Sequence, residues 1–169
     1  RLAPLLLITL LAGCAAIGAD TRRLEADKGL LEARRHAEIA AQPPPCARPE
    51  PVCRQAQEIR AEACRSLAAA DAARRREHLA CAVAAYRAAL EGEAPPRRAP
   101  LLNLAAAAND AITAGAGDPG ATAEAELLAA DGLLRTAGPA DPEGCYYAGS
   151  ARLARALLQS PGPGRCAEL

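Results

Sequence analysis

The sequence contains no Phe, Trp or Met, and its only aromatic residues are three tyrosines. This scarcity argues against a β-sandwich or β-barrel, because strands favour aromatic and β-branched side chains. Its 20 basic and 20 acidic residues cancel, which argues against a nucleic-acid-binding protein that relies on bulk charge. The remaining sequence is rich in Ala, Leu and Arg over 169 residues. This composition predicts one all-α domain without cofactor.

The amino terminus is an almost unbroken apolar run, residues 2–11, that leads to Leu11-Ala12-Gly13-Cys14. The run is too short to cross a bilayer, which needs roughly 20 apolar residues. It has the length of the hydrophobic region of a signal peptide, and small residues precede the cysteine as at a processing site. One alternative is an ordinary secretory signal with Cys14 as a structural cysteine.

This segment resembles the lipobox of bacterial lipoproteins. The resemblance implies cleavage before Cys14, which makes residues 1–13 a signal peptide, and attachment of diacylglyceryl and acyl (palmitate) groups to that cysteine. Two or three acyl chains give a stable membrane anchor where one does not. The resemblance further implies the periplasmic side of the outer membrane, since Ala15 rather than Asp follows the cysteine. We expect residues 14–45 to form the anchor and an N-terminal helix, and residues 46–169 a helical domain.

Six cysteines remain beside Cys14, an even number that predicts up to three disulfides in an oxidising compartment. Fifteen connectivities are open. An antiparallel helix pair turning near Asp71 would bring Cys64 and Cys81 together. The other candidate pairs are a short loop between Cys46 and Cys53, and a clamp on the C-terminal tail between Cys145 and Cys166.

Apolar spacing and helix-stop residues predict about five helices stacked as hairpins. The expected ranges are from Asp20 or Thr21 to about 41, from 53 to the residues before Asp71, from Asp71 to 90, from 98 to 114, from 121 to 136, and from 141 to before the loop at 160–164. Helix openings near Arg54, Arg98 and Glu143 recur roughly every 45 residues, and each interval encloses a helix pair or part of one, as in stacked hairpins. The segment Ala82–Leu90 resembles the second helix of a tetratricopeptide repeat. Ordinary packing of Ala-rich helices is the alternative.

No catalytic constellation is found. The two histidines, His36 and His78, stand in no recognised motif, and no nucleophile elbow or phosphate-binding loop is present. A metal site made by His78 and Cys81 with Cys53 or Cys64 matches no common zinc spacing. We therefore expect neither an enzyme nor a metalloprotein.

Candidate partner-binding residues fall into two groups. Three consecutive arginines, Arg74, Arg75 and Arg76, centre a basic first half that is followed by an acidic second half. They predict either a docking surface for an acidic partner, anionic lipid or cell-wall polymer, or, as the favoured interpretation, solvated faces that attract each other within the fold. The second group comprises the aromatic candidates for a groove, Tyr86, Tyr146 and Tyr147, although Tyr86 suits the core better.

These features predict a lipid-anchored periplasmic protein that acts as a binding or assembly subunit of a bacterial envelope complex. At class level it resembles small helical lipoproteins such as pilotins and tetratricopeptide lipoproteins. The alternatives are a permanent structural subunit without an exchangeable ligand and, less favoured, a periplasmic enzyme. A concave groove would favour the binding subunit, and a large apolar face would favour the structural one.

Overall fold

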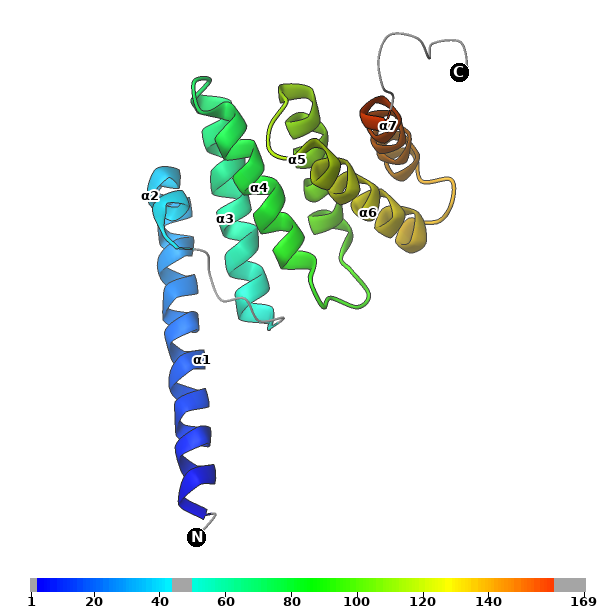
Figure 1. Ribbon diagram of the computed structural model, residues 1–169. Coiled ribbons are helices and arrows are strands. Elements are labelled where there is room, and N and C mark those ends of the chain that lie inside the picture. The colour runs from blue at the N-terminus through cyan, green and yellow to red at the C-terminus, as the bar shows by residue number, and fades with distance from the viewer. Residues whose placement is uncertain (1–2, 44–49, 160–169) are drawn as a thin grey trace, which may run out of the picture.

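The computed structural model describes residues 3–43 and 50–159, with the backbone alone for residues 3–17 and 159. These residues form seven helices and no strand, so the predicted all-α class is confirmed. The helices are α1 (Ala3–Glu32), α2 (His36–Ala41), α3 (Pro51–Ala70), α4 (Arg75–Leu90), α5 (Arg98–Ala114), α6 (Pro119–Ala137) and α7 (Pro142–Gln159). They follow one another across the molecule in chain order (Figure 1). None of these helices is both long and apolar enough to span a membrane.

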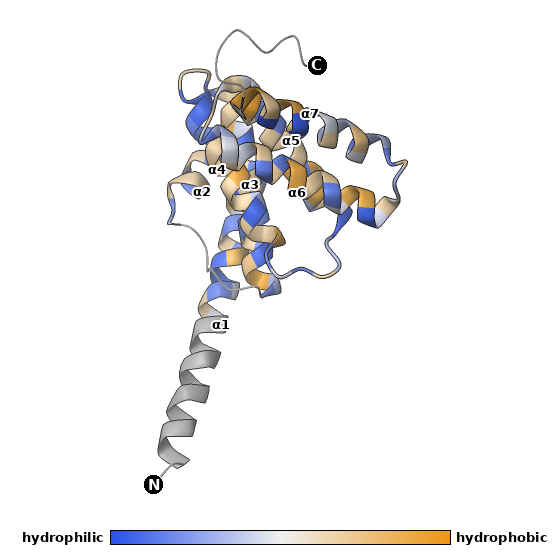
Figure 2. Cartoon of the chain, turned by 45° about the vertical axis from the view of Figure 1, so that its right-hand side comes forward, coloured by the Kyte–Doolittle hydropathy of each residue, from blue (hydrophilic) through white to orange (hydrophobic). Residues whose placement is uncertain are grey.

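Each of α3 to α7 packs mainly on the helix before and the helix after it. The helices α3, α5 and α7 begin at residues 51, 98 and 142, which agrees with the predicted period of roughly 45 residues. Hydrophobic and hydrophilic residues are interleaved along the helices (Figure 2), as expected for amphipathic helices that share a core. The array is a stack of helical hairpins.

The predicted bounds of α5, Arg98 to Ala114, are confirmed because strong local signals fix its end. Gly115 adopts φ 63°, a left-handed conformation that glycine enters without a Cβ clash. The backbone N–H of Ala116 then donates to the carbonyl of Ala111 at 2.8 Å, which closes a Schellman motif. The next helix, α6, is capped by Asp118, whose Oδ1 accepts from the Ala121 N–H at 2.7 Å.

The prediction of one helix from Asp20 or Thr21 to Ala41 is wrong. The chain reverses at residues 33–35, where Arg34 has φ 57°, and α2 folds back. An unbroken helix would place Ile39 about 22 Å beyond Leu24. The reversal instead lets both side chains join one buried cluster with Ala56, Ile59 and Ala63 of α3.

Asp71 does not begin α4 as predicted. It follows α3, and its Oδ1 accepts from the backbone N–H groups of Ala73 and Arg74 at 3.1 and 3.2 Å. This carboxylate therefore stabilises the turn between the helices, and α4 begins four residues later, at Arg75.

The main core is built largely from alanine. More than half of the buried hydrophobic residues are Ala, and Leu104 and Leu133 are the largest apolar side chains that are completely buried. Small side chains let helix axes approach closely. At one such contact Gly132 of α6 faces Leu101 of α5, and a Cβ on Gly132 would lie 2.6 Å from Leu101 Cδ2.

The predicted Cys64–Cys81 disulfide is confirmed and joins α3 to α4, with a Cα–Cα distance of 6.0 Å. Closing a loop of this length contributes about 3 kcal/mol in the chain-entropy account. Cys53 is also disulfide-bonded, but the predicted pair Cys46–Cys53 involves Cys46, which lies outside the described residues.

Cys145 carries a free, exposed thiol, so the expected clamp on Cys166 is not formed in this structure; Cys166 lies outside the described residues. The helix α7 continues from Cys145 to Gln159, about 21 Å at 1.5 Å per residue. The following residues to Cys166 would span at most about 23 Å when fully extended. A bridge would therefore need an almost straight return along the whole helix.

A buried polar network ties α7 to α5 and α6. The Asn109 side chain donates to Glu126 Oε1 at 3.0 Å and to Ser150 Oγ at 2.7 Å. Glu126 is fully buried, and its Oε2 has no hydrogen-bond partner among the described residues. Burial raises the pKa of Glu126, so the folded protein binds this proton more tightly than an ordinary exposed glutamate does.

We expect Glu126→Gln to stabilise the protein at neutral pH by about 1 to 2 kcal/mol, because an amide replaces an under-bonded buried carboxylate. Since the pKa of Glu126 is higher in the folded than in the unfolded state, its protonation contributes stability to the wild type. This contribution is fully present below the ordinary pKa of glutamate, about 4.5, and is lost as the pH rises through the raised pKa of the folded state. Urea unfolding from pH 4 to 8 should show this loss in the wild type and its absence in the variant. A variant less stable at pH 7.5 would contradict the argument.

Two helical glycines offer a matched pair. Gly132→Ala should destabilise the protein by about 1 to 2 kcal/mol, because the added methyl would overlap buried Leu101. Gly149→Ala on α7 meets nothing within 4 Å and should stabilise by about 0.5 to 1 kcal/mol through helix propensity. Thermal unfolding of both variants checks the pair, and equal shifts of the same sign would refute the close contact between α5 and α6.

Candidate functional site

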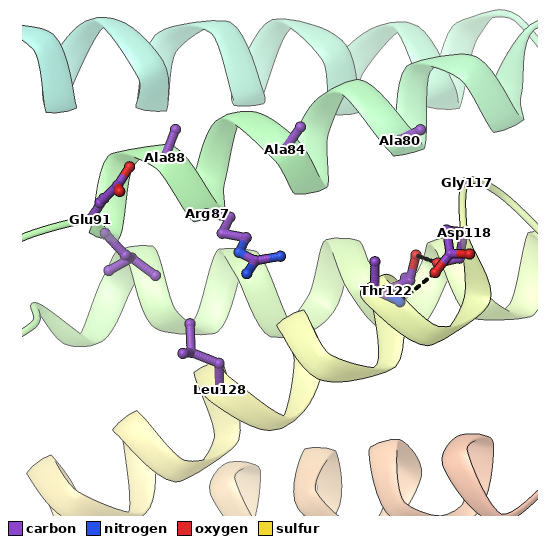
Figure 3. Close-up of a pocket in the computed structure, with 11 residues that line it drawn as sticks. Ala80, Ala84, Arg87, Ala88, Glu91, Gly117, Asp118, Thr122 and Leu128 are labelled. Atoms are coloured by element: carbon purple, nitrogen blue, oxygen red, sulfur yellow. Dashed lines mark hydrogen bonds between the residues drawn. The ribbon is translucent and has the colours of Figure 1, made fainter. Parts of the chain in front are cut away.

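A groove of about 620 Å³ lies between α4 and α6, with α5 running between them (Figure 3). One wall presents Ala80, Ala84 and Ala88, four residues apart on α4, and the other begins at Ala121 of α6. Ala84 and Ala121 are exposed and Ala80 and Ala88 are half-buried. The groove is therefore accessible to solvent and has smooth, small-residue walls.

The two walls diverge from one end of the groove to the other (Figure 3). At the narrow end Gly117, with φ 69°, brings the backbone before α6 close to α4, where a Cβ would lie 3.7 Å from Ala80 Cβ. At the wide end Leu90 and Leu128 supply apolar surface, and Leu128 is 49% exposed. A ligand would meet a tight polar end and a wide apolar end.

Arg87 extends from α4 into the middle of this groove (Figure 3). Its side chain is exposed and forms no ion pair or hydrogen bond within the described part of the chain. Two acidic residues also line the groove, Glu91 and Asp118. Glu91 points away from the guanidinium (Figure 3), and Asp118 caps α6. The groove therefore contains one guanidinium that has no ion-pair partner among the described residues, although two carboxylates line the same groove.

The structure separates the three predicted arginines from this groove. They lie at the turn between α3 and α4, at the end of the array opposite the amino terminus of α1 (Figure 1). Arg74 pairs with Glu77, with Nε 2.9 Å from Oε2. Arg75 and Arg76 are exposed and line a hollow of about 290 Å³ with Thr113. That hollow adjoins the carboxyl end of α5, where the helix dipole disfavours an anion.

The predicted tyrosines are not brought together. Tyr86 is buried in the main core, and burial raises the pKa of its phenol. Tyr146 and Tyr147 lie on α7 in an edge-to-face contact, with ring centroids 5.1 Å apart. Of the three tyrosines only Tyr146 is exposed, by 62%. No tyrosine lines the groove between α4 and α6.

Tyr146 instead shares the outer face of α7 with two leucines. Leu153 and Leu157 follow it at intervals of seven and four residues, which places all three on one side of the helix. All three are exposed, Leu157 by 66%. This apolar face has no neighbour among the described helices, because α7 packs on α6 and α5 through its other side.

Several charges of the basic and acidic halves attract each other within the fold. Arg98 pairs with Glu143, and its Nη2 lies 2.9 Å from Asp141 Oδ1, which links α5 to the start of α7. A hydrogen bond from the Gly144 N–H, aided by Arg98, lowers the pKa of Asp141. Arg97 pairs with Glu58 and Glu93. The Arg98 contacts join the basic half to the acidic half and support the favoured interpretation, whereas the Arg97 pairs lie within the basic half.

The metal hypothesis fails because Cys64 and Cys81 are bonded to each other. His78 is buried at the start of α4 and approaches Asp71, at 3.9 Å. One cluster with ligand spacing occurs among the described residues, Asp20, Glu50 and Cys53. Its sulphur is already in a disulfide and is not available as a thiolate.

Sequence reasoning did not find the groove. Ala84 and Ala88 share a face of α4, which predicts packing against a neighbouring helix, but in the structure they face open space. The sequence feature that could have indicated the groove is the row of alanines on that face of α4, next to Arg87. Only the three-dimensional divergence of α4 and α6 distinguishes an exposed alanine stripe from a buried one.

The chain matches no protein-family model, no curated protein and no solved structure. The groove, the outer face of α7 and the amino-terminal segment are therefore the features from which a function can be argued.

Proposed function

We propose that this protein is a lipid-anchored, non-catalytic subunit of a bacterial envelope complex, and that it binds a partner protein in the groove between α4 and α6. The observation that carries the proposal is the accessible groove with the unpaired Arg87. Specific protein sites combine apolar surface with a few placed polar groups. This groove has the apolar surface of Leu90 and Leu128 and three charged groups, of Arg87, Glu91 and Asp118.

The anchor part of the proposal rests on the resemblance of Leu11-Ala12-Gly13-Cys14 to a lipobox. Cys14 lies on α1, about 15 Å along the helix before Leu24, which is buried against the array. In Figure 1 the amino-terminal half of α1 continues past the end of α3. A lipid on Cys14 would hold the helical array on the periplasmic side of the outer membrane.

The same geometry argues against docking of the three arginines on the anchoring membrane. The turn that carries Arg74–Arg76 lies at the far end of α3 from the amino terminus of α1 (Figure 1). Since α3 has 20 residues, it spans about 30 Å. This exceeds the Debye length of about 8 Å at physiological salt, so attraction to that membrane would be screened.

A permanent structural subunit remains the second candidate function, favoured by the apolar outer face of α7. Tyr146, Leu153 and Leu157 would be covered in a stable complex. The two candidates predict different sensitive surfaces, because the first binds through the groove and the second through α7.

The test is purification of the full chain from its own membranes in mild detergent, with co-purifying proteins quantified by mass spectrometry. We expect acylation of Cys14 and a stoichiometric partner. Ala84→Trp should remove that partner by filling the groove, whereas Ala69→Trp, at an exposed site on α3 outside the groove, should retain it. Loss with Leu157→Glu but not with Ala84→Trp would establish the structural alternative. An unacylated Cys14, or recovery without a partner, would overturn the proposal.

A further inference from the structure

The unpaired Arg87 restricts what the groove can hold. Arg87 lies in the last turn of α4 and lines the groove. Among the described residues no carboxylate comes within ion-pair distance of its guanidinium. A ligand that covers this guanidinium must supply a negative group, since a charge buried without a partner costs several kcal/mol.

The walls of the groove favour a helical ligand. The methyl groups of Ala80, Ala84 and Ala88 recur at every turn of α4, and small residues allow a second helix to pack at short interaxial distance. The described residues contain no strand, so an extended ligand has no sheet edge to join. A helix laid along α4 would be framed by α6 on its other side.

The two ends of the groove set the register of such a helix. Near Ala80 and Gly117 the walls are close, which admits only small side chains. Toward Leu90 and the half-exposed Leu128 they are wide and apolar. Arg87 precedes Leu90 by one helical turn, so the carboxylate and an apolar side chain of the ligand should be three or four residues apart.

We infer that the groove binds a helix of the partner protein, with a side-chain carboxylate of that helix paired to Arg87 and an apolar side chain against Leu90 and Leu128. This inference rests on the proposed function and names the partner's chemistry. The occupant is thus an Ala-rich or otherwise small-residue helix that carries Asp or Glu one turn from a Leu-like residue.

The experiment places a photo-crosslinking amino acid, p-benzoylphenylalanine, at Glu91, an exposed residue that lines the groove, and separately at Leu153 on α7. The full chain is irradiated in its native cells, and the crosslinked peptides are sequenced by mass spectrometry. We expect the crosslinker at position 91 to capture a partner helix with a carboxylate beside an apolar residue. Arg87→Glu should lower that yield about tenfold or more, because like charges would face each other.

Arg135→Glu is the matched control, since it makes the same charge change at an exposed residue of α6 outside the groove. It should leave the crosslink unchanged. Reversal of the partner's carboxylate to Arg should restore the yield with Arg87→Glu. Circular dichroism of both variants confirms that each folds, as expected for exposed positions.

The remaining outcomes separate this inference from the proposed function. A groove crosslink that survives Arg87→Glu, or that maps to a segment without a carboxylate or to a second copy of this chain, overturns the inference. A partner crosslinked only from Leu153 also overturns it and supports assembly through α7. No protein crosslinked from either position would overturn both the inference and the proposed function.

Discussion

The close packing of helices through alanine is the constraint on which the rest of this structure depends. Without Phe, Trp or Met, the chain must obtain its core from many small contacts, and Leu104 and Leu133 are the largest apolar side chains that it buries completely. Alanine gains little transfer free energy per residue, because the gain scales with the area buried. The helices compensate for this small gain by packing closely, since Gly132 lies against Leu101 and Gly144 lies against Leu134. Such contacts form best between consecutive helices, which accounts for a stack in chain order.

The first and last helices of a stack do not pack against each other as they do in a bundle. Other interactions must therefore hold the helices at its two ends. At one end the Cys64–Cys81 disulfide joins α3 and α4, and Leu24 and Ile39 fix the amino-terminal helices to α3. At the other end the Glu126–Asn109–Ser150 network and the Arg98–Asp141 ion pair hold α7. The second set is polar and includes a buried carboxylate whose pKa is raised. The last helix thus buries fewer hydrophobic residues than each of α3 to α6, and its outer leucines stay exposed.

The sequence predicted what local chemistry determines. The bounds of α5 follow from proline before it and glycine after it, and the Cys64–Cys81 pairing follows from the turn near Asp71. It did not predict the reversal at Arg34, because no glycine or proline marks it; the burial of Ile39 beside Leu24 decides it. Nor did it predict the groove. The same alanine spacing serves a buried face on α5 and an exposed one on α4, and only the angle between α4 and α6 separates the two cases.

The charge distribution explains why a single arginine would matter for recognition. Equal numbers of acidic and basic residues, several of them paired across helices, leave little long-range field to steer a partner. An exposed ion pair alone contributes at most about 1 kcal/mol, so Arg87 would confer selectivity more than affinity. A membrane anchor supplies what the groove lacks, because tethering two proteins to one surface raises their effective concentration toward the millimolar range. Under the proposed function, a shallow groove with one unpaired guanidinium is then sufficient: the lipid on Cys14 provides the encounter, and Arg87 determines which helix is accepted.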